Sequence, residues 1–344
     1  MVARFFMLKN FKTPTKFIFF LFFLLFFLLI NKTYSSDQVK IGAYINDVQY
    51  LELDSHSYSL DFYLWFKWTN PKINPSESFE FMNAFELWGH SLTRNTESPV
   101  QLATGEYYQV VRVQGRFSHK FQLQNYPFDR QFLVIEFEDN EKQIADLKYV
   151  IDEVTPISIN PSMSLPGFEI ESPQMTISQK THPTDFGEGE KNQKQSTYAR
   201  VKIQLPIVRP VLTYLFKTIL PILCVVFSTC LMFLFYPTFV DARVGIGITS
   251  LLTIVALQIT LNYDLPEIDY LILMDKIYLV TYLFIVMSLS VIVYASWIVA
   301  KNNHSLDQLV FEKLVKIDRL SLIALMIFYL ICVSCLILFA ISKR

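Results

Sequence analysis

The run DARVGIGITSLLTIVALQITLNY occupies residues 241–263, and beyond Arg243 it contains no charged residue. A helix over this run would be long enough to cross the hydrocarbon of a bilayer, which takes about 20 mostly apolar residues. One stripe of the run, at spacings of three and four residues, passes from charged through polar to apolar. It consists of Asp241, Gly245, Thr249, Leu252, Ala256 and Ile259. Such a stripe predicts a helix that lines a pore, hydrated near Asp241 and Thr249 and closed by dewetting at its apolar residues.

The same run has a second interpretation. Small residues such as Gly245 and Gly247 are common where membrane helices pack closely against one another. The stripe would then be a packing face rather than a pore lining. The spacing alone leaves both interpretations open.

Three further apolar runs accompany this one. They are Thr218–Phe235, Ile277–Ala300 and Leu320–Ser342, and each is long enough for a membrane helix. A chain that is 52% hydrophobic, with 31 Phe, is also too apolar for an ordinary soluble domain. We therefore predict a four-helix transmembrane domain over residues 210–344. Its helices are expected at about 212–235, 242–263, 272–300 and 318–342.

The charges between the apolar runs predict how this domain is oriented. The linker at 301–317 carries Lys301, Lys313 and Lys316, and short loops rich in Lys and Arg stay in the cytoplasm. The linker before the third run is acidic, which suits the outside. Four crossings then place both the N-terminal domain and the C-terminus outside, in a multi-pass protein of the cell membrane.

The segment 37–209 has a different pattern. Apolar side chains alternate along it with a period of two, as at Tyr58, Leu60 and Phe62, and Pro, Gly and Asn clusters interrupt the alternation. This pattern predicts an all-β domain of about ten short strands outside the membrane, an immunoglobulin-like sandwich or a barrel.

The first 36 residues are predicted to be a signal peptide. Basic residues precede the apolar run Phe17–Ile30, and Ser35 and Ser36 follow it. An uncleaved membrane helix is the alternative, but the 14 residues of Phe17–Ile30 fall short of the ~20 that a spanning helix needs.

No pattern in the chain indicates an enzyme, a metal site, a cofactor or a nucleic-acid partner. The formal net charge is −1 at pH 7 without a basic run, and catalytic triads, metal-ligand spacings and phosphate-binding glycine loops are missing. The five His are scattered, and we expect them to be solvated. The four Cys, which lie in apolar runs and predict no disulfide, are Cys224, Cys230, Cys332 and Cys335.

Two motifs carry a family resemblance. Residues 242–253 resemble the pore-helix motif of glycine and GABA type A receptors. Residues 126–131, YPFDRQ, resemble the segment at the base of the Cys-loop in the same superfamily. The flanking cysteines are missing and the linker at 301–317 is short, as in prokaryotic members. The chain is thus similar to a subunit of a pentameric ligand-gated ion channel of the Cys-loop receptor superfamily.

The resemblance implies a homopentamer of identical subunits in the lipid bilayer, around a central pore that an agonist opens. It also implies a layer of residues that couples the β domain to the helices. The candidates are a hairpin carboxylate, Glu52 or Asp54, together with Phe128, Asp129, Arg209 and Pro266. The alternative is that these charges form surface ion pairs, which contribute only about 0–1 kcal/mol each.

The resemblance further implies an agonist site between neighbouring β domains. Its candidate residues are Tyr63, Met82, Glu138, Asp139, Phe186 and Tyr198. Aromatic rings suit a small amine through cation–π attraction. Acidic residues of the hairpin at 185–197 leave proton gating as an alternative.

The inner mouth of the pore determines which ion we expect to pass. Asp241 stands where the resembled receptors have Pro or Ala, and a ring of carboxylates favours monovalent cations. We therefore expect a cation channel. Arg243, two residues later, keeps an anion-selective channel open as the alternative, and a non-conducting or accessory receptor subunit is a further one.

Overall fold

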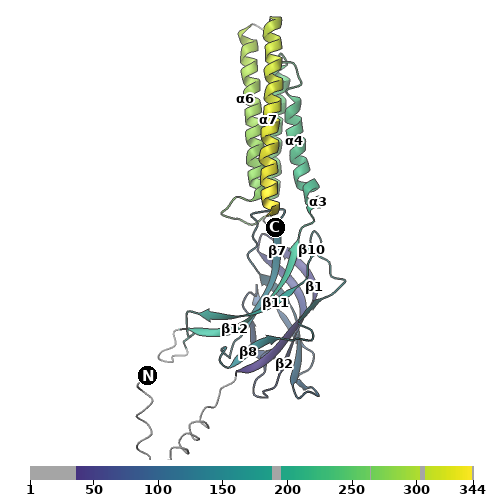
Figure 1. The fold of residues 1–344 in the computed structure, drawn as a ribbon, viewed down its shortest axis with the longest axis vertical. Coiled ribbons are helices and arrows are strands. Elements are labelled where there is room, and N and C mark those ends of the chain that lie inside the picture. Colours follow the sequence, from purple (N-terminus) through teal and green to yellow (C-terminus); the bar gives the residue numbers. More distant parts are fainter. Residues whose placement is uncertain (1–35, 188–194, 264, 303–306, 343–344) are drawn as a thin grey trace, which may run out of the picture.

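The computed structural model of the chain describes residues 36–187, 195–263, 265–302 and 307–342. The signal peptide predicted at 1–36 lies outside these ranges except for Ser36, as does the stretch 188–194 of the acidic hairpin. A β domain and a bundle of long helices lie end to end (Figure 1). The predicted fold class, a mostly β domain followed by four long apolar helices, is thereby confirmed.

The β domain consists of two sheets. The seven-stranded sheet has the order β4-β6-β2-β1-β8, with β5 beside β6 and β9 beside β1, and the five-stranded sheet has the order β10-β12-β7-β3, with β11 beside β12. The first sheet contains β1 (Asp37–Glu52), β2 (Ser57–Trp68), β4 (Ser91–Arg94), β5 (Val100–Gln101), β6 (Tyr107–Ser118), β8 (Leu147–Ile151) and β9 (Ile157–Ile159). The second contains β3 (Phe79–Phe81), β7 (Arg130–Asp139), β10 (Glu169–Ile170), β11 (Gln174–His182) and β12 (Ser196–Val208).

Strand β2 shows why the two sheets pack together. Its even-numbered side chains, from Tyr58 to Trp68, are all buried, whereas Tyr63 and Lys67 are half-buried on the opposite face. The alternation read from the sequence is therefore the alternation between core and surface. The ring of Phe66 lies 6.5 Å from that of Phe137 on β7, which belongs to the other sheet. Aromatic contacts of this kind fill the space between the sheets.

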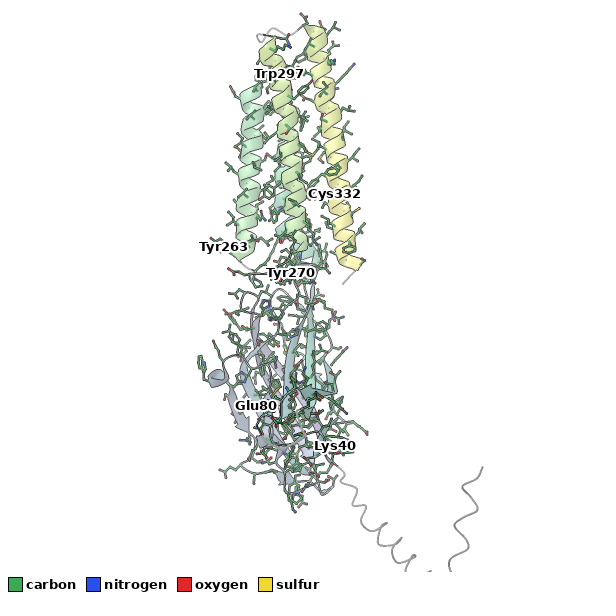
Figure 2. All side chains as sticks on the ribbon, turned by 90° about the vertical axis from the view of Figure 1, so that its left-hand side faces the viewer. Lys40, Glu80, Tyr263, Tyr270, Trp297 and Cys332 are labelled. Atoms are coloured by element: carbon green, nitrogen blue, oxygen red, sulfur yellow. The ribbon has the colours of Figure 1, made fainter. Side chains whose placement is uncertain are left out.

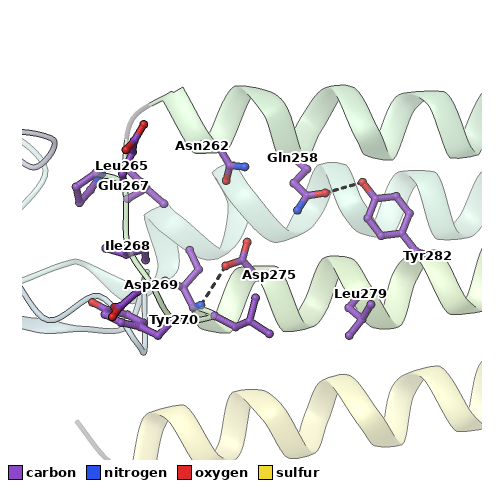
Figure 3. A pocket seen from close by; sticks show the side chains of 13 residues that line it. Gln258, Asn262, Leu265, Glu267, Ile268, Asp269, Tyr270, Asp275, Leu279 and Tyr282 are labelled. Atoms are coloured by element: carbon purple, nitrogen blue, oxygen red, sulfur yellow. Dashed lines mark hydrogen bonds between the residues drawn. The ribbon is translucent and has the colours of Figure 1, made fainter.

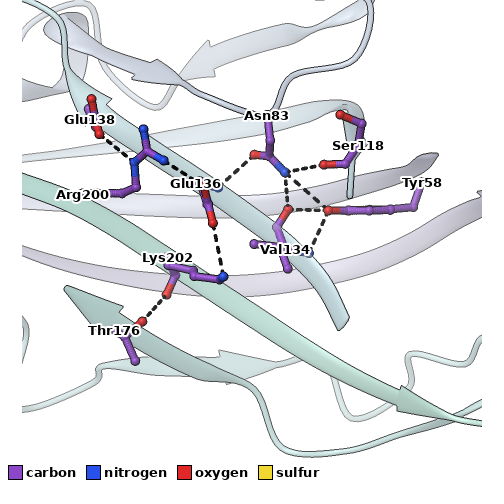
Figure 4. A network of polar contacts seen from close by, with 9 residues as sticks. All are labelled: Tyr58, Asn83, Ser118, Val134, Glu136, Glu138, Thr176, Arg200 and Lys202. Atoms are coloured by element: carbon purple, nitrogen blue, oxygen red, sulfur yellow. Dashed lines mark hydrogen bonds and ion pairs between the residues drawn. The ribbon is translucent and has the colours of Figure 1, made fainter. Parts of the chain in front are cut away.

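One polar cluster crosses the apolar core (Figure 4). The Tyr58 hydroxyl donates a hydrogen bond to the Val134 carbonyl at 2.5 Å and accepts one from the Val134 N–H at 2.8 Å. The Asn83 amide also donates to the Val134 carbonyl, at 2.7 Å. Strand β3 pairs with β7 only from Phe137 to Asp139, so these side chains satisfy backbone groups that the shorter strand leaves unpaired.

The helices of the bundle all come after the β domain in the chain. They are α3 (Val211–Tyr214), a π-helical turn (Leu215–Ile219), α4 (Leu220–Leu231), α5 (Val240–Tyr263), α6 (Leu273–Lys301) and α7 (Gln308–Ser342). In the described part of the chain, four helical segments, the first running through Val211–Leu231, are long and apolar enough to cross a membrane. Helix α7 begins ten residues earlier than the 318 expected. Its first turns bury Leu314 and Asp318 and expose charged residues, so an amphipathic face extends the helix where hydropathy alone would end it.

The ends of the helices mark the two membrane surfaces. Helix α7 ends beside the β domain (Figure 1), so the described C-terminal end and the β domain are on the same side, as predicted. Tyr263 and Tyr270 lie at this end of the bundle and Trp297 lies near the other (Figure 2). Tyr263 and Trp297 are exposed, which is typical of aromatic residues at a membrane–water interface.

We expect Tyr58→Phe to lower the melting temperature of the purified protein in detergent. The substitution leaves the Val134 N–H buried without the hydroxyl, which costs about 1–3 kcal/mol. The measurement is thermal unfolding followed by intrinsic fluorescence. Tyr50→Phe is the matched control, because the Tyr50 side chain is exposed. Equal melting temperatures for the two variants would contradict the role given to the Tyr58 hydroxyl.

Candidate functional site

The predicted pore stripe lies on one face of α5. All six of its residues are exposed in the single subunit, whereas Arg243, Gly247, Ser250 and Ile254 are buried on the opposite face. Leu252 is 65% exposed, although it lies in the middle of a membrane helix. The neighbouring helices of the same subunit therefore leave this stripe free to face another body.

The two glycines of α5 have different surroundings. A Cβ built on Gly247 would lie 2.3 Å from Leu289 Cδ2 on α6, whereas a Cβ on Gly245 meets nothing within 4 Å. Gly247 therefore permits close packing of α5 on α6, and Gly245 belongs to the exposed stripe. The packing interpretation therefore fits the face that contains Gly247, and the pore lining stays a prediction for the face that contains Gly245.

Hydroxyl groups on the exposed side of α5 are satisfied within the helix. Thr249 donates to the Gly245 carbonyl at 2.8 Å, and Thr253 donates to the Thr249 carbonyl at 2.8 Å. A threonine that bonds back to the preceding turn still offers its oxygen lone pairs. These positions make the stripe polar without requiring a partner side chain.

A buried ion pair joins the β domain to the first membrane helix. Arg209, at the end of β12, lies with its Nε 3.3 Å from the Asp129 Oδ1, and both side chains are at most 3% exposed. The guanidinium lies over the rings of Tyr126, Phe168 and Tyr214, at 4.9, 4.5 and 5.0 Å from their centroids. Such a cage of π faces favours a buried cation. Two of the predicted coupling residues, Asp129 and Arg209, are thus brought together.

The loop between β6 and β7 contains Asp129 and is closed by hydrogen bonds. The Gln131 amide donates to the Gln122 carbonyl at 2.7 Å and to the Asp129 carboxylate at 2.5 Å, while its Oε1 accepts the Gln122 N–H at 3.2 Å. All four cysteines are free. In this chain a glutamine therefore holds the loop to the strand that follows it. Phe128, from the same loop, is buried in the core.

This loop is bonded directly to the linker between α5 and α6. The Leu123 N–H donates to the Tyr270 hydroxyl at 3.1 Å, and the Leu273 N–H donates to the Gln124 carbonyl at 2.9 Å. Tyr270 and the buried Pro266 line a cavity of about 650 Å³ between the end of α5 and the start of α6, on the side of the β domain (Figure 3). Sequence reasoning did not single out Tyr270 for coupling, because a single tyrosine after a linker carries no pattern.

The hairpin carboxylates lie elsewhere, which corrects their assignment to this cluster. Glu52 pairs with Arg116 on β6 and accepts a hydrogen bond from Ser55 at 2.7 Å. Asp54 is exposed and accepts the Ser55 N–H at 2.8 Å. Arg116 is the nearer cation because β6 pairs with β2 beside the hairpin.

Three predicted agonist-site residues lie close together: Glu138 on β7, Tyr198 on β12 and Phe186 in the turn after β11. Glu138 accepts one hydrogen bond from Arg200 Nε at 2.6 Å (Figure 4) and contacts His182 at 3.0 Å. The rings of His182, Phe186 and Tyr198 lie 5.5–6.4 Å apart, edge to face. Phe186 is exposed. We call Glu138, His182, Phe186, Tyr198 and Arg200 the aromatic cluster.

The other candidates for the agonist site lie apart from the aromatic cluster. Tyr63 belongs to the other sheet, where the Arg112 guanidinium lies 5.5 Å from its ring centre. Met82 follows β3 and is 36% exposed. Asp139 is buried, where it accepts hydrogen bonds from Ser78 and from the backbone, and burial raises its pKa. Asp139 therefore fixes a loop, while Tyr63 and the aromatic cluster lie in different sheets.

The histidines are not solvated as expected. Among the described residues, all four are partly buried. The His56 ring accepts the Phe121 N–H at 3.1 Å, His90 packs on Phe117, and burial lowers the pKa of His119. These contacts could not be predicted from the sequence, because they join histidines to residues that are distant in the chain.

We expect Gly247→Ala to reduce the amount of assembled protein at the cell surface. The added methyl group would overlap Leu289, and overpacking typically costs about 1–3 kcal/mol. Surface biotinylation of the full chain measures the effect. Gly245→Ala is the matched control, with normal surface levels expected. Equal loss in both variants would contradict the assignment of the two glycines to different faces.

Comparison with known proteins finds channel and receptor subunits that are similar to the chain. It is 26% identical over 156 residues to a glutamate-gated chloride channel subunit beta of Haemonchus contortus, covering 45% of this chain and 34% of that protein. It is 26% identical over 194 residues to a gamma-aminobutyric acid receptor subunit beta of Lymnaea stagnalis, covering 56% and 36%. A glycine receptor subunit beta of Rattus norvegicus is 23% identical over 259 residues, covering 69% and 50%. No protein-family model matches the chain.

The chain spans about a third to a half of the length of these relatives. The similarity nevertheless agrees with the architecture, because a β sandwich precedes four membrane-spanning helices. The relatives are channels or receptors rather than enzymes. The chain is a multi-pass membrane protein with an extracellular β domain, and it is similar to subunits of the Cys-loop receptor superfamily.

Proposed function

We propose that the chain is a subunit of a ligand-gated ion channel whose pore is lined by α5. The observation that carries the proposal is the exposed stripe from Asp241 to Ile259, which the other helices of the subunit do not cover. It is graded from a carboxylate through a hydroxyl to bulky apolar side chains. Leu252 and Ile259 would close the pore by dewetting, and Thr249 would keep its inner half hydrated.

A pentamer of identical subunits is part of this proposal. One helix cannot enclose a pore, and the resemblance implies a closed ring of subunits. In such a ring each aromatic cluster would face the Tyr63 side of the next subunit. The bilayer surrounds the helices, and monovalent ions pass through the centre.

The aromatic cluster is the proposed agonist site on one side of each interface. Exposed Phe186 and half-buried Tyr198 offer π faces to the ammonium group of a small amine or amino acid. The proton alternative would act at the contact between the His182 ring and the Glu138 carboxylate, whose atoms lie 3.0 Å apart. Binding there would reach α5 through the loop that contains Asp129 and its bond to Tyr270.

Anion selectivity is the better-supported proposal for the permeant ion. Relatives named as chloride channels favour it, over the cation channel expected from the sequence. Asp241 alone favours the second candidate, since its exposed carboxylate lies at the cytoplasmic end of α5. The two candidates differ in the reversal potential of the current.

We expect cells that express the chain alone to carry a current when small amino acids, amines or acid are applied, and to lose the response in Tyr198→Ala. With sodium and chloride gradients set apart, we expect reversal near the chloride potential. Asp241→Asn should shift reversal further in that direction, because it removes a ring of carboxylates.

A current that reverses near the sodium potential in the wild type, and moves toward the chloride potential in Asp241→Asn, would instead establish the cation channel. Surface labelling controls for expression. Protein at the surface that passes no current under any of these stimuli would contradict the proposal of a homomeric channel.

We expect Arg209→Lys to raise the agonist concentration for half-maximal current by about tenfold, with normal surface levels. Lysine keeps the charge beside Asp129 but loses the flat guanidinium that lies over three rings. The matched control is Arg130→Lys, because Arg130 pairs with Glu171 on the surface, where both side chains are about 40% exposed. A shift of equal size in both variants would show that the Arg209 cage has no special role in coupling.

A further inference from the structure

A second buried ion pair lies at the other end of the bundle. Arg243, in the first turn of α5, is fully buried. Its Nε donates to the Met232 carbonyl at 2.9 Å and its Nη2 donates to the Asp318 Oδ2 at 2.6 Å. Asp318 belongs to α7 and is 2% exposed. The guanidinium therefore ties the start of α5 to the end of α4 and to a helix that contributes no residue to the pore stripe.

The geometry of this pair suggests that it holds the Arg243 guanidinium in place rather than adding much to the stability of the fold. Only one nitrogen of Arg243 bonds to the carboxylate, and the Nη1 of Arg243 and the Oδ1 of Asp318 are buried without a hydrogen-bond partner. A two-point contact would satisfy both atoms and bind more strongly. Burying two charges with incomplete compensation contributes little net stability. What the contact does determine is where the guanidinium lies.

That position matters because Asp241 is only two residues away. Side chains two positions apart in an α-helix point in directions about 200° apart. Accordingly, Asp241 is exposed on the stripe, and Arg243 is buried on the opposite face. Arginine has a long stem, so a guanidinium released near the helix start would reach the aqueous mouth. Two charged residues of α7 lie close to Asp318 in the sequence, and both of them, Lys316 and Arg319, are exposed. Asp318 is therefore the buried counter-charge that this part of α7 supplies.

We infer that Asp318 is a positioning residue for ion selectivity: it retains Arg243 inside the subunit and so leaves Asp241 as the charge that permeating ions meet at the cytoplasmic mouth. The inference rests on the proposed function, since it assumes that the stripe of α5 faces a pore. It assigns a role in selectivity to a residue of α7, outside that stripe.

The test compares sodium-to-chloride permeability ratios in the full-length channel. Asp318→Asn removes the counter-charge, and the released arginines should offset the ring of Asp241, so we expect the ratio to fall by about tenfold. The double variant Arg243→Gln, Asp318→Asn has no buried charge and should regain the wild-type ratio. Glu312→Gln is the matched control, because it removes an exposed carboxylate from the same helix, and it should leave the ratio unchanged.

A wild-type ratio in a conducting Asp318→Asn channel would overturn the inference, as would a shifted ratio in the double variant. If Asp318→Asn does not reach the surface, a shifted ratio in the double variant still overturns the inference. Failure of the proposed function would be recognised separately, as a wild type at the surface without current.

A second readout needs no current. Ala242→Cys, exposed beside the mouth, is introduced after the four native cysteines are replaced by alanine. Its modification from the cytoplasmic side is timed with anionic and cationic methanethiosulfonate reagents. We expect Asp318→Asn to raise the ratio of anionic to cationic rates by about tenfold, and an unchanged ratio would overturn the inference.

Discussion

The cost of burying a charge in apolar surroundings governs this subunit at both ends of its membrane domain. Burying a lone guanidinium costs free energy, and the guanidinium groups of Arg209 and Arg243 each have an aspartate beside them. Asp129 reaches Arg209 from a loop of the β domain, and Asp318 reaches Arg243 from the last helix. Because Arg209 precedes the first membrane helix and Arg243 begins the second, the two pairs fix both ends of the segment that leads to the pore stripe.

The two pairs differ in what surrounds their charges. The guanidinium of Arg209 lies over three aromatic rings, and Asp129 also accepts a hydrogen bond from Gln131. The pair of Arg243 has a single charged contact and an adjacent backbone carbonyl. The first arrangement suits a junction that must transmit force between two domains without separating. The second suits a side chain whose charge must be kept away from the exposed face of α5.

Much of the fold could be predicted from periodicity. A period of two gave the inward face of β2, and hydropathy located four membrane helices, because both patterns depend on local burial. The early start of α7 and the partners of Glu52 could not be predicted in this way. The first depends on one buried face in a charged segment, and the second on Arg116 of a neighbouring strand, 64 residues away in the chain. Contacts of that kind leave no trace in local composition.

The glycines and charges of α5 show the same limit within a single helix. Gly245 and Gly247 cannot be told apart from the sequence, because both are small residues of the same helix. Only Gly247 packs against Leu289. Asp241 and Arg243 likewise look like a compensating pair in the sequence, which made selectivity ambiguous. In the folded subunit they point to opposite faces, and the cation is compensated by Asp318 instead. If the stripe of α5 lines a pore, as proposed, the charge of its mouth depends on how the other helices retain the Arg243 side chain, and not only on the residues that line the pore.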